Sequence, residues 1–243
     1  MNTRSLLRLS GTDANDFLQG LITNDVSKAK DGLVYAALLT PQGKFIADFF
    51  VAADGDALLI DVATSHAPTL AQRLTMYRLR ADVLIEESPL VVSRGTGPAP
   101  SGSHPDPRHS ALGWRLFSDT DQSDDTNWDA LRVAHVIPET GIELTPDTYI
   151  LEAGFERLNG IDFRKGCYVG QEIAARMKHK TELKKGLAQV AIDGAAPIGT
   201  QITADGKPVG TLYTQSDGLA LAHLRFDRAK GAMQADKATL QRT

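Results

Sequence analysis

The stretch Lys165-Gly166-Cys167-Tyr168-Val169-Gly170-Gln171-Glu172 contains the only cysteine of the 243-residue chain. Arg164 precedes the stretch, and apolar residues at helical spacing predict a helix from about Tyr168 to Lys180. Cations and helix N-termini both stabilise a thiolate, so the sequence predicts an accessible, reactive thiol at Cys167. A buried structural cysteine is the alternative, because free cysteines are among the most buried residues.

The composition is that of an ordinary globular protein, with 42% hydrophobic and 23% charged residues. The formal net charge of −4 does not favour binding to nucleic acid or to an anionic membrane. A single cysteine excludes an internal disulfide and a multi-cysteine zinc site, and it fits a reducing compartment. No apolar run approaches the ~20 residues of a membrane span, and the polar N-terminus has no signal-peptide core, so we expect a cytoplasmic protein.

Upstream of the cysteine, the pattern predicts an antiparallel meander rather than alternating parallel strands. Apolar runs at 33–39, 44–52 and 57–62 are separated by the turns Pro41-Gln42-Gly43 and Asp54-Gly55. Helices are expected before and after this meander. Residues 93–110 contain four prolines and three glycines, which predicts a mobile loop that does not pack.

Downstream of residue 183 the pattern changes to short alternating strands. They are separated by Asp193-Gly194, Asp205-Gly206 and Asp217-Gly218, which predicts a small β-barrel. The chain is therefore expected to be an α+β protein with two domains, residues 1–182 and 183–243.

The familiar catalytic motifs are missing from the sequence. There is no Gly-x-Ser-x-Gly elbow and no phosphate-binding glycine motif, and the six histidines lack metal-ligand spacing, so no metal site is expected. Residues 164–185 carry seven Lys/Arg against two Glu. This charge run is typical of a solvated helix, and the alternative is a site for an anionic tail such as polyglutamate or phosphate.

The eight residues 165–172, followed by Ala175-Arg176, resemble the signature of the YgfZ family. That family binds folate, is related to the glycine-cleavage T-protein, and acts in the maturation or repair of iron–sulfur proteins. Further similarity to its N-terminal pattern, first hairpin and C-terminal barrel is carried by Phe17–Gly20 with Thr23–Val26, by Leu39–Lys44 with Asp48, and by Val209–Thr211 with Leu219–Leu224.

The resemblance implies a T-protein-like folate-binding body of antiparallel sheets with helices, followed by a small β-barrel. It implies tetrahydrofolate as the ligand, with Trp128 matching a tryptophan of the family's pocket. Around that pocket we expect Tyr35, Asp48 and, at its anionic end, Arg132 or Arg176. It also assigns Cys167 as the functional thiol, within a motif whose other members are Lys165, Gly166, Tyr168, Gly170, Gln171 and Glu172.

The resemblance implies iron–sulfur client or carrier proteins as partners. A membrane is not expected as a partner, and the net negative charge argues against a nucleic acid. A [4Fe–4S] cluster normally needs four thiolates, so no resident cluster is expected in the monomer. Ala63 and Ala134 stand where the T-protein's catalytic aspartate and glutamate are expected, which argues against enzymatic turnover. The alternatives are a folate-dependent aminomethyltransferase or related one-carbon enzyme, a thiol enzyme using Cys167, and an RNA-binding module through residues 164–185.

Overall fold

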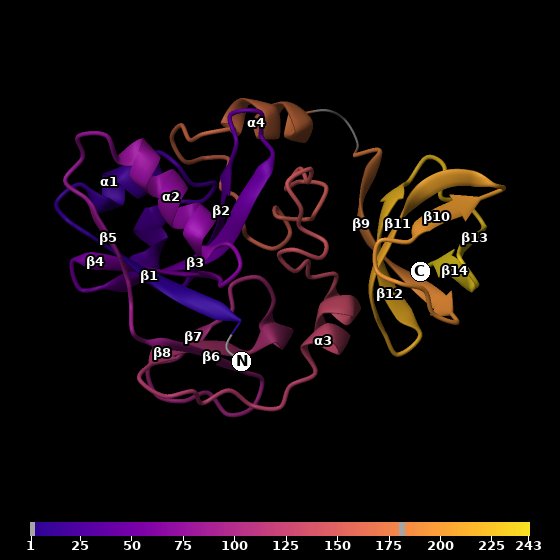
Figure 1. Cartoon of the computed structure of the whole chain (residues 1–243), viewed down its shortest axis with the longest axis horizontal. Coiled ribbons are helices and arrows are strands. Elements are labelled where there is room, and N and C mark those ends of the chain that lie inside the picture. The colour runs from indigo at the N-terminus through magenta and orange to yellow at the C-terminus, as the bar shows by residue number, and fades with distance from the viewer. Residues whose placement is uncertain (1–2, 180–182) are drawn as a thin grey trace. The chain divides into compact units, whose positions relative to one another are not determined.

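The computed structural model describes residues 3–179 and 183–243 (Figure 1). Contacts between residues divide the chain into two compact units. We call them the sheet unit, which comprises residues up to 126 together with 155–175, and the barrel unit, which comprises residues 127–154 and 176–243. The predicted α+β class is confirmed. The two units interleave along the chain, whereas the sequence predicted one boundary near residue 183.

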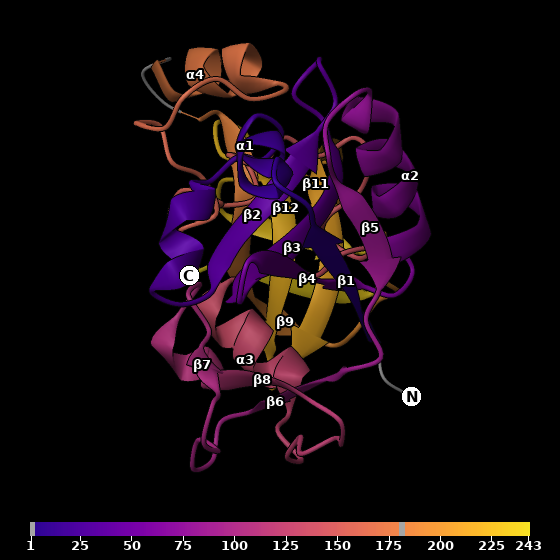
Figure 2. The same cartoon turned by 90° about the vertical axis from the view of Figure 1, so that its left-hand side faces the viewer.

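The sheet unit is built on a five-stranded antiparallel sheet in the order β2-β3-β4-β1-β5 (Figure 2). Its first hairpin turns at Thr40–Lys44, where Gly43 has a φ of +75° and donates its N–H to the Thr40 carbonyl. The second hairpin turns at Gly55, which has a φ of +59°. The strands are β1 (Arg4–Ser10), β2 (Val34–Leu39), β3 (Phe45–Asp54), β4 (Ala57–Ala63) and β5 (Leu84–Glu87).

One face of this sheet packs against two helices, α1 (Ala14–Gln19) and α2 (Ala67–Arg78), and against a 3₁₀ turn, η1 (Val26–Lys30). Side chains alternate across a strand, so Phe49, Val51, Ile60 and Val62 join Leu70 of α2 in one apolar core. The intervening residues point to the opposite face. That second face carries the polar side chains of the candidate site.

Residues 91–118 form a second sheet in the order β6-β8-β7, with β6 (Val91–Gly95), β7 (His104–Pro105), a 3₁₀ turn η2 (Ser110–Leu112) and β8 (Trp114–Ser118). This corrects the expectation that residues 93–110 do not pack. Asp106 and Arg108 are buried, and the Asp124 carboxylate accepts the N–H groups of Thr96 and Gly97 at 2.8 and 3.0 Å. The composition misled because ion pairs and turn hydrogen bonds, rather than apolar side chains, hold this segment.

The barrel unit contains a closed barrel in the order β10-β11-β12-β9-β14-β13, which confirms the predicted barrel. Two of its hairpins turn at Asp205-Gly206 and Asp217-Gly218, where both residues of each pair have positive φ, as a type I′ turn requires. Its strands are β9 (Lys185–Asp193), β10 (Gln201–Ala204), β11 (Lys207–Ser216), β12 (Leu219–Arg225), β13 (Ala232–Ala235) and β14 (Ala238–Arg242).

Helix α3 (Trp128–His135) belongs to the barrel unit because a buried arginine fixes it there. Arg132 pairs with Glu143 at 3.0 Å and donates to Thr214 Oγ1 of β11 at 2.9 Å. The last helix is α4 (Gln171–His179). Over the described ranges, each helix is too short or too polar to cross a bilayer.

Candidate functional site

The cysteine lies on a loop, which we call the Cys167 loop (residues 164–170). Cys167 is exposed. The expected helix does not begin beside it: α4 starts at Gln171, four residues later. The influence of a helix dipole falls off within the first turn, so Cys167 receives less of it than the sequence suggested.

Lys165 is anchored in the body of the sheet unit. Its Nζ donates to the carbonyl oxygens of Gln19 and Ile22, both at 2.6 Å, and the residue is 8% exposed. Burial lowers the pKa of Lys165 to about 8, against the opposing effect of Asp25 and Asp162. Arg164, in contrast, has a side chain that is 93% exposed. Of the two cations expected to stabilise the thiolate, one is therefore committed to main-chain carbonyls.

Two further motif residues fix the same loop. Gly170 has a φ of +84°, and a Cβ at this position would lie 2.7 Å from the Thr40 carbonyl oxygen, so only glycine fits against the first hairpin. Tyr168 is buried, which raises its pKa to about 12. Its hydroxyl has no hydrogen-bond partner among the described residues, and its ring centroid is 5.2 Å from Lys165 Nζ.

The remaining motif residues are Gly166, which is exposed, and Gln171 and Glu172, which form the first turn of α4. The motif at 165–172 therefore meets two other stretches that carry the family resemblance, the one at the end of α1 and the one at the first hairpin. The Cys167 loop rests on the end of α1 and on the hairpin at 40–44.

The Thr23-Asn24-Asp25 stretch holds the segment that leads into the Cys167 loop. Thr23 Oγ1 donates to the Gly160 carbonyl at 2.6 Å, and Asn24 Nδ2 donates to the Asn159 carbonyl at 2.7 Å. Asp162 N–H donates to the Thr23 carbonyl at 3.0 Å. These bonds bring residues 159–162 beside β2.

A pocket of about 500 Å³ opens where these two segments meet. Its lining includes Phe163, the exposed Asn159, two cations and two carboxylates, so it can hold a flat ligand and satisfy polar edges on it. Lys28 Nζ pairs with Asp162 Oδ2 across this wall at 2.7 Å. The lining residues are Asn24, Lys28, Leu33, Val34, Tyr35, Pro107, Glu156, Asn159, Ile161, Asp162, Phe163 and Arg164.

Tyr35 connects the pocket to a buried polar interior. Its hydroxyl donates to Asp48 Oδ2 at 2.9 Å, and its ring stacks on Phe155 with centroids 5.0 Å apart. Burial raises the pKa of Tyr35 well above its usual value, and the charge of Asp48 adds to this effect. The phenol is therefore a hydrogen-bond donor to Asp48 at all physiological pH values.

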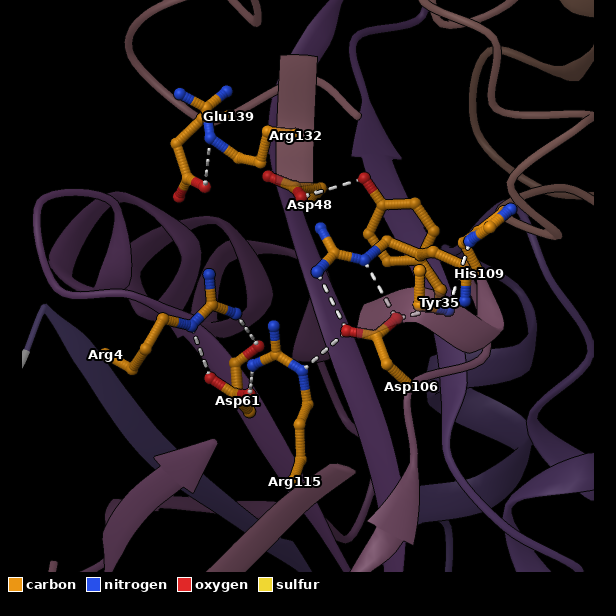
Figure 3. Close-up of polar contacts among 11 residues, drawn as sticks. Arg4, Tyr35, Asp48, Asp61, Asp106, His109, Arg115, Arg132 and Glu139 are labelled. Carbon is orange, nitrogen blue, oxygen red and sulfur yellow. Dashed lines mark hydrogen bonds and ion pairs between the residues drawn. The ribbon is translucent and has the colours of Figure 1, made fainter. Parts of the chain in front are cut away.

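A chain of buried ion pairs, which we call the ion-pair network, continues behind Tyr35 on the sheet face opposite α1 and α2 (Figure 3). Asp61 accepts from Arg4 at 2.6 Å and from Arg115 at 2.7 Å. Asp106 accepts from Arg115 at 3.1 Å and from Arg108 at 2.8 Å.

Asp106 shows how strongly this network is coupled. Burial alone would raise its pKa, but Arg108 and Arg115 outweigh burial and hold it well below its usual value. The guanidinium carbons of Arg115 and Arg108 lie 3.8 and 4.9 Å from the Phe50 ring centroid, which favours their burial. The network thus fixes the 106–108 segment, whose Pro107 lines the pocket.

The expected folate residues divide between the two units. Tyr35 lines the pocket and Asp48 is its hydrogen-bond partner, whereas Trp128, Arg132 and Arg176 belong to the barrel unit. Arg132 is buried and engaged with Glu143, Thr214 and Asp129; Trp128 is half-buried.

Sequence reasoning missed several pocket residues, namely Asn24, Lys28, Asn159, Asp162 and Phe163. The Thr23-Asn24-Asp25 pattern was the available signal, but it was interpreted as a family marker only. In the described ranges, 3–179 and 183–243, no three His, Cys, Asp or Glu side chains gather into a metal site. Ala63 ends β4 and Ala134 lies on α3, so neither position provides a titratable group.

Residues 184–243 match the family model of the CAF17 C-terminal β-barrel domain. The mitochondrial iron–sulfur cluster assembly factor IBA57 homologue of Neurospora crassa is 32% identical, over 85% of this chain and 56% of its own length. The mitochondrial IBA57 assembly factors of mouse and human are 27% and 28% identical, over 96% of this chain and 78% of theirs. This chain thus spans about half the length of the Neurospora protein.

The crystal structure of the glycine cleavage system aminomethyltransferase T from Bartonella henselae has a TM-score of 0.77 at 12% identity, covering 98% of this chain and 82% of that one. It confirms the predicted T-protein-like fold. The expectation of a cytoplasmic protein is wrong by this comparison, because the similar Neurospora, mouse and human proteins are mitochondrial.

Proposed function

We propose that the chain, which is similar to the IBA57 iron–sulfur cluster assembly factors, acts in the maturation or repair of iron–sulfur proteins through Cys167. Similarity to these proteins extends over 85–96% of the chain, so it includes the sheet unit as well as the barrel. One observation carries the proposal furthest: the sole cysteine is exposed on a loop that two other stretches of the sequence, the end of α1 and the hairpin at 40–44, hold in place.

Cys167 provides one sulfur atom, which limits the chemistry that we propose. A [4Fe–4S] cluster normally takes four thiolates, and this chain has one cysteine. A cluster in contact with Cys167 is therefore cargo, with its other ligands supplied by a second protein. The partners that we propose are iron–sulfur client or carrier proteins.

We propose tetrahydrofolate or a derivative as the ligand of the pocket, in keeping with the resemblance to the YgfZ family. The pocket residues fit such a molecule: about 500 Å³ suits a ligand of this size, Phe163 offers an aromatic side chain, and Lys28 and Arg164 offer cations for a carboxylate end. Tetrahydrofolate would supply a one-carbon carrier. The chain's own contribution is to bind and orient it, with the exposed Asn159 side chain as a hydrogen-bonding group.

We also propose that the chain does not transfer aminomethyl groups, because Ala63 and Ala134 leave the expected acidic positions without a proton acceptor. Release of a one-carbon unit from the aminomethylated lipoyl carrier at more than a trace rate would favour the aminomethyltransferase alternative. Trp128 remains a proposed folate contact from the resemblance alone.

The experiment that tests the function removes the chain from its own cells and returns it on a plasmid. The activities of a [4Fe–4S] dehydratase and of a cluster-free enzyme are measured, each divided by the abundance of its polypeptide. We expect the first ratio to fall severalfold on deletion and to recover with the plasmid, while the second stays constant. An unchanged dehydratase ratio contradicts the proposal.

A further inference from the structure

The side chains of the Cys167 loop alternate between the interior and the solvent. Lys165 and Tyr168 are 8% and 7% exposed, while Arg164 and Cys167 are exposed. The loop therefore has two buried attachment points, one on each side of the cysteine. Of the two, Lys165 makes side-chain hydrogen bonds to another segment, while the Tyr168 hydroxyl has no partner among the described residues.

The contacts of Lys165 join it to the backbone. The two acceptors, Gln19 O and Ile22 O, lie at the end of α1 and just beyond it, where helical carbonyls lack partners within the helix. An ammonium group donates to both at 2.6 Å, a short distance typical of charge-assisted bonds. Its ammonium group is thereby solvated by carbonyl dipoles inside the sheet unit.

This geometry separates two roles that the sequence left combined. A cation that stabilises the thiolate does so through its electrostatic field at the sulfur. Two hydrogen bonds from the same cation to main-chain carbonyls instead fix where the loop lies. Gly170 supports the second role, because its contact with Thr40 fixes the other end of the loop. A loop held at both ends holds the cysteine between them at a defined place.

We infer that Lys165 is a positioning residue: its two main-chain hydrogen bonds fix the Cys167 loop so that the thiol is presented to a partner protein, and it does not activate the sulfur electrostatically. The inference rests on the proposed function for the identity of the partner. The fixing of the loop by these two hydrogen bonds is a property of this chain and is measurable without any partner.

The test compares Lys165→Met, which keeps most of the buried stem without the donors, with Lys165→Ala. Lys30→Met is the matched control, because Lys30 is exposed in the same unit. Hydrogen exchange is measured for amides 164–170 and for strands β2–β4. We expect exchange in the loop to rise at least tenfold in both Lys165 variants, with the strands unchanged. Added propylamine replaces the missing stem and ammonium, so it should slow hydrogen exchange of the loop amides in Lys165→Ala. Tetramethylammonium lacks N–H donors and should not slow this exchange.

The second readout is the rate of iodoacetamide labelling as a function of pH, which reports Cys167 alone because the chain has one cysteine. We expect the profile of Lys165→Met to coincide with that of the parent within twofold, while its support of the [4Fe–4S] dehydratase in cells falls severalfold. A profile displaced to higher pH would mean that Lys165 acts on the sulfur, and it would overturn the inference. Loop exchange within twofold of the parent, or an equal rise in β2–β4, would also overturn it.

Failure of the proposed function gives a different result. In that case Cys167→Ser supports the dehydratase as well as the parent does, whatever the exchange data show. A loosened loop in Lys165→Met together with full activity of Cys167→Ser would support the positioning role of Lys165 and would show that the thiol is not needed for the function.

Discussion

Tyr35 donates its phenolic hydrogen to Asp48 across the first hairpin of the sheet unit at 2.9 Å, and both side chains are buried. Tyr35 also lines the pocket, so this one bond connects the proposed ligand site to the polar interior. The same sheet face carries the ion-pair network. The sheet face opposite α1 and α2 is therefore lined with buried charge.

Replacing Tyr35 by Phe removes this bond and leaves a buried carboxylate with one donor fewer. We expect the free energy of unfolding to fall by about 1–3 kcal/mol, which is the usual cost of an unsatisfied buried acceptor. Urea denaturation of the two proteins at pH 7 measures the difference. A loss near zero would show that water or another donor replaces the phenol without cost.

Asp106→Asn tests the ion-pair network. Removing the charge leaves Arg108 and Arg115 without one of their acceptors, and breaking a buried pair in this way costs about 3–5 kcal/mol. The pH dependence has a definite sign. The folded pKa of Asp106 lies below the unfolded value of ~3.9, so its contribution is complete above that value and is lost as the pH falls toward the folded pKa.

The parent should therefore lose stability between about pH 5 and pH 2 more steeply than Asp106→Asn does. Thermal denaturation over this range, with both proteins in the same salt, shows the two slopes. Parallel slopes would mean that Asp106 does not titrate differently in the folded and unfolded chains.

Leu79 is expected to destabilise the fold. It follows α2 with φ 48° and ψ −103°, and the N–H of Ala81 donates to the Arg78 carbonyl across it at 2.8 Å. This is the geometry of the first central position of a type II′ turn, which glycine favours, and the leucine is 88% exposed, so little packing compensates.

Leu79→Gly should accordingly raise the free energy of unfolding by about 1 kcal/mol, because relief of strain exceeds the added entropy of the unfolded chain. Leu79→Ala is the matched control, since it keeps the Cβ and should give no such gain. Equal stability of the glycine and alanine variants in urea would contradict the assignment of strain.

Phe163→Ala tests the position of the ligand pocket. If tetrahydrofolate stacks on this ring, loss of the ring weakens binding by about 1–3 kcal/mol, or roughly 5- to 150-fold in Kd. Isothermal titration calorimetry with an intact circular dichroism spectrum measures the effect. An unchanged Kd would place the ligand elsewhere.

The sequence predicted those features that depend on local pattern. The meander of β2, β3 and β4 and the barrel hairpins follow from apolar alternation and Asp-Gly turns, which act over a few residues. The signature at 165–172 likewise marked the Cys167 loop. The sequence showed that Lys165 carries a charge. It did not show that this charge binds the carbonyl oxygens of Gln19 and Ile22.

Polar pairing beyond the local pattern accounts for the failed expectation at residues 93–110. The segment 93–110 has a composition typical of a mobile loop, yet Asp106 meets Arg115 of β8 and thereby packs. Arg132, expected at the anionic end of the folate pocket, forms an ion pair with Glu143 and donates a hydrogen bond to Thr214 within the barrel unit. Such partners lie 9, 11 and 82 residues apart along the chain, and nothing in a local pattern specifies them.

The central claim is that Cys167 carries the function, and the most direct measurement replaces it with serine, a nearly isosteric residue. Cells that lack the chain are given the parent or Cys167→Ser at equal abundance, and the specific activity of a [4Fe–4S] dehydratase is measured after oxidative stress. We predict that the parent restores the activity and that Cys167→Ser leaves it severalfold lower, with unchanged folding and unchanged tetrahydrofolate binding. Full restoration by Cys167→Ser would contradict the account.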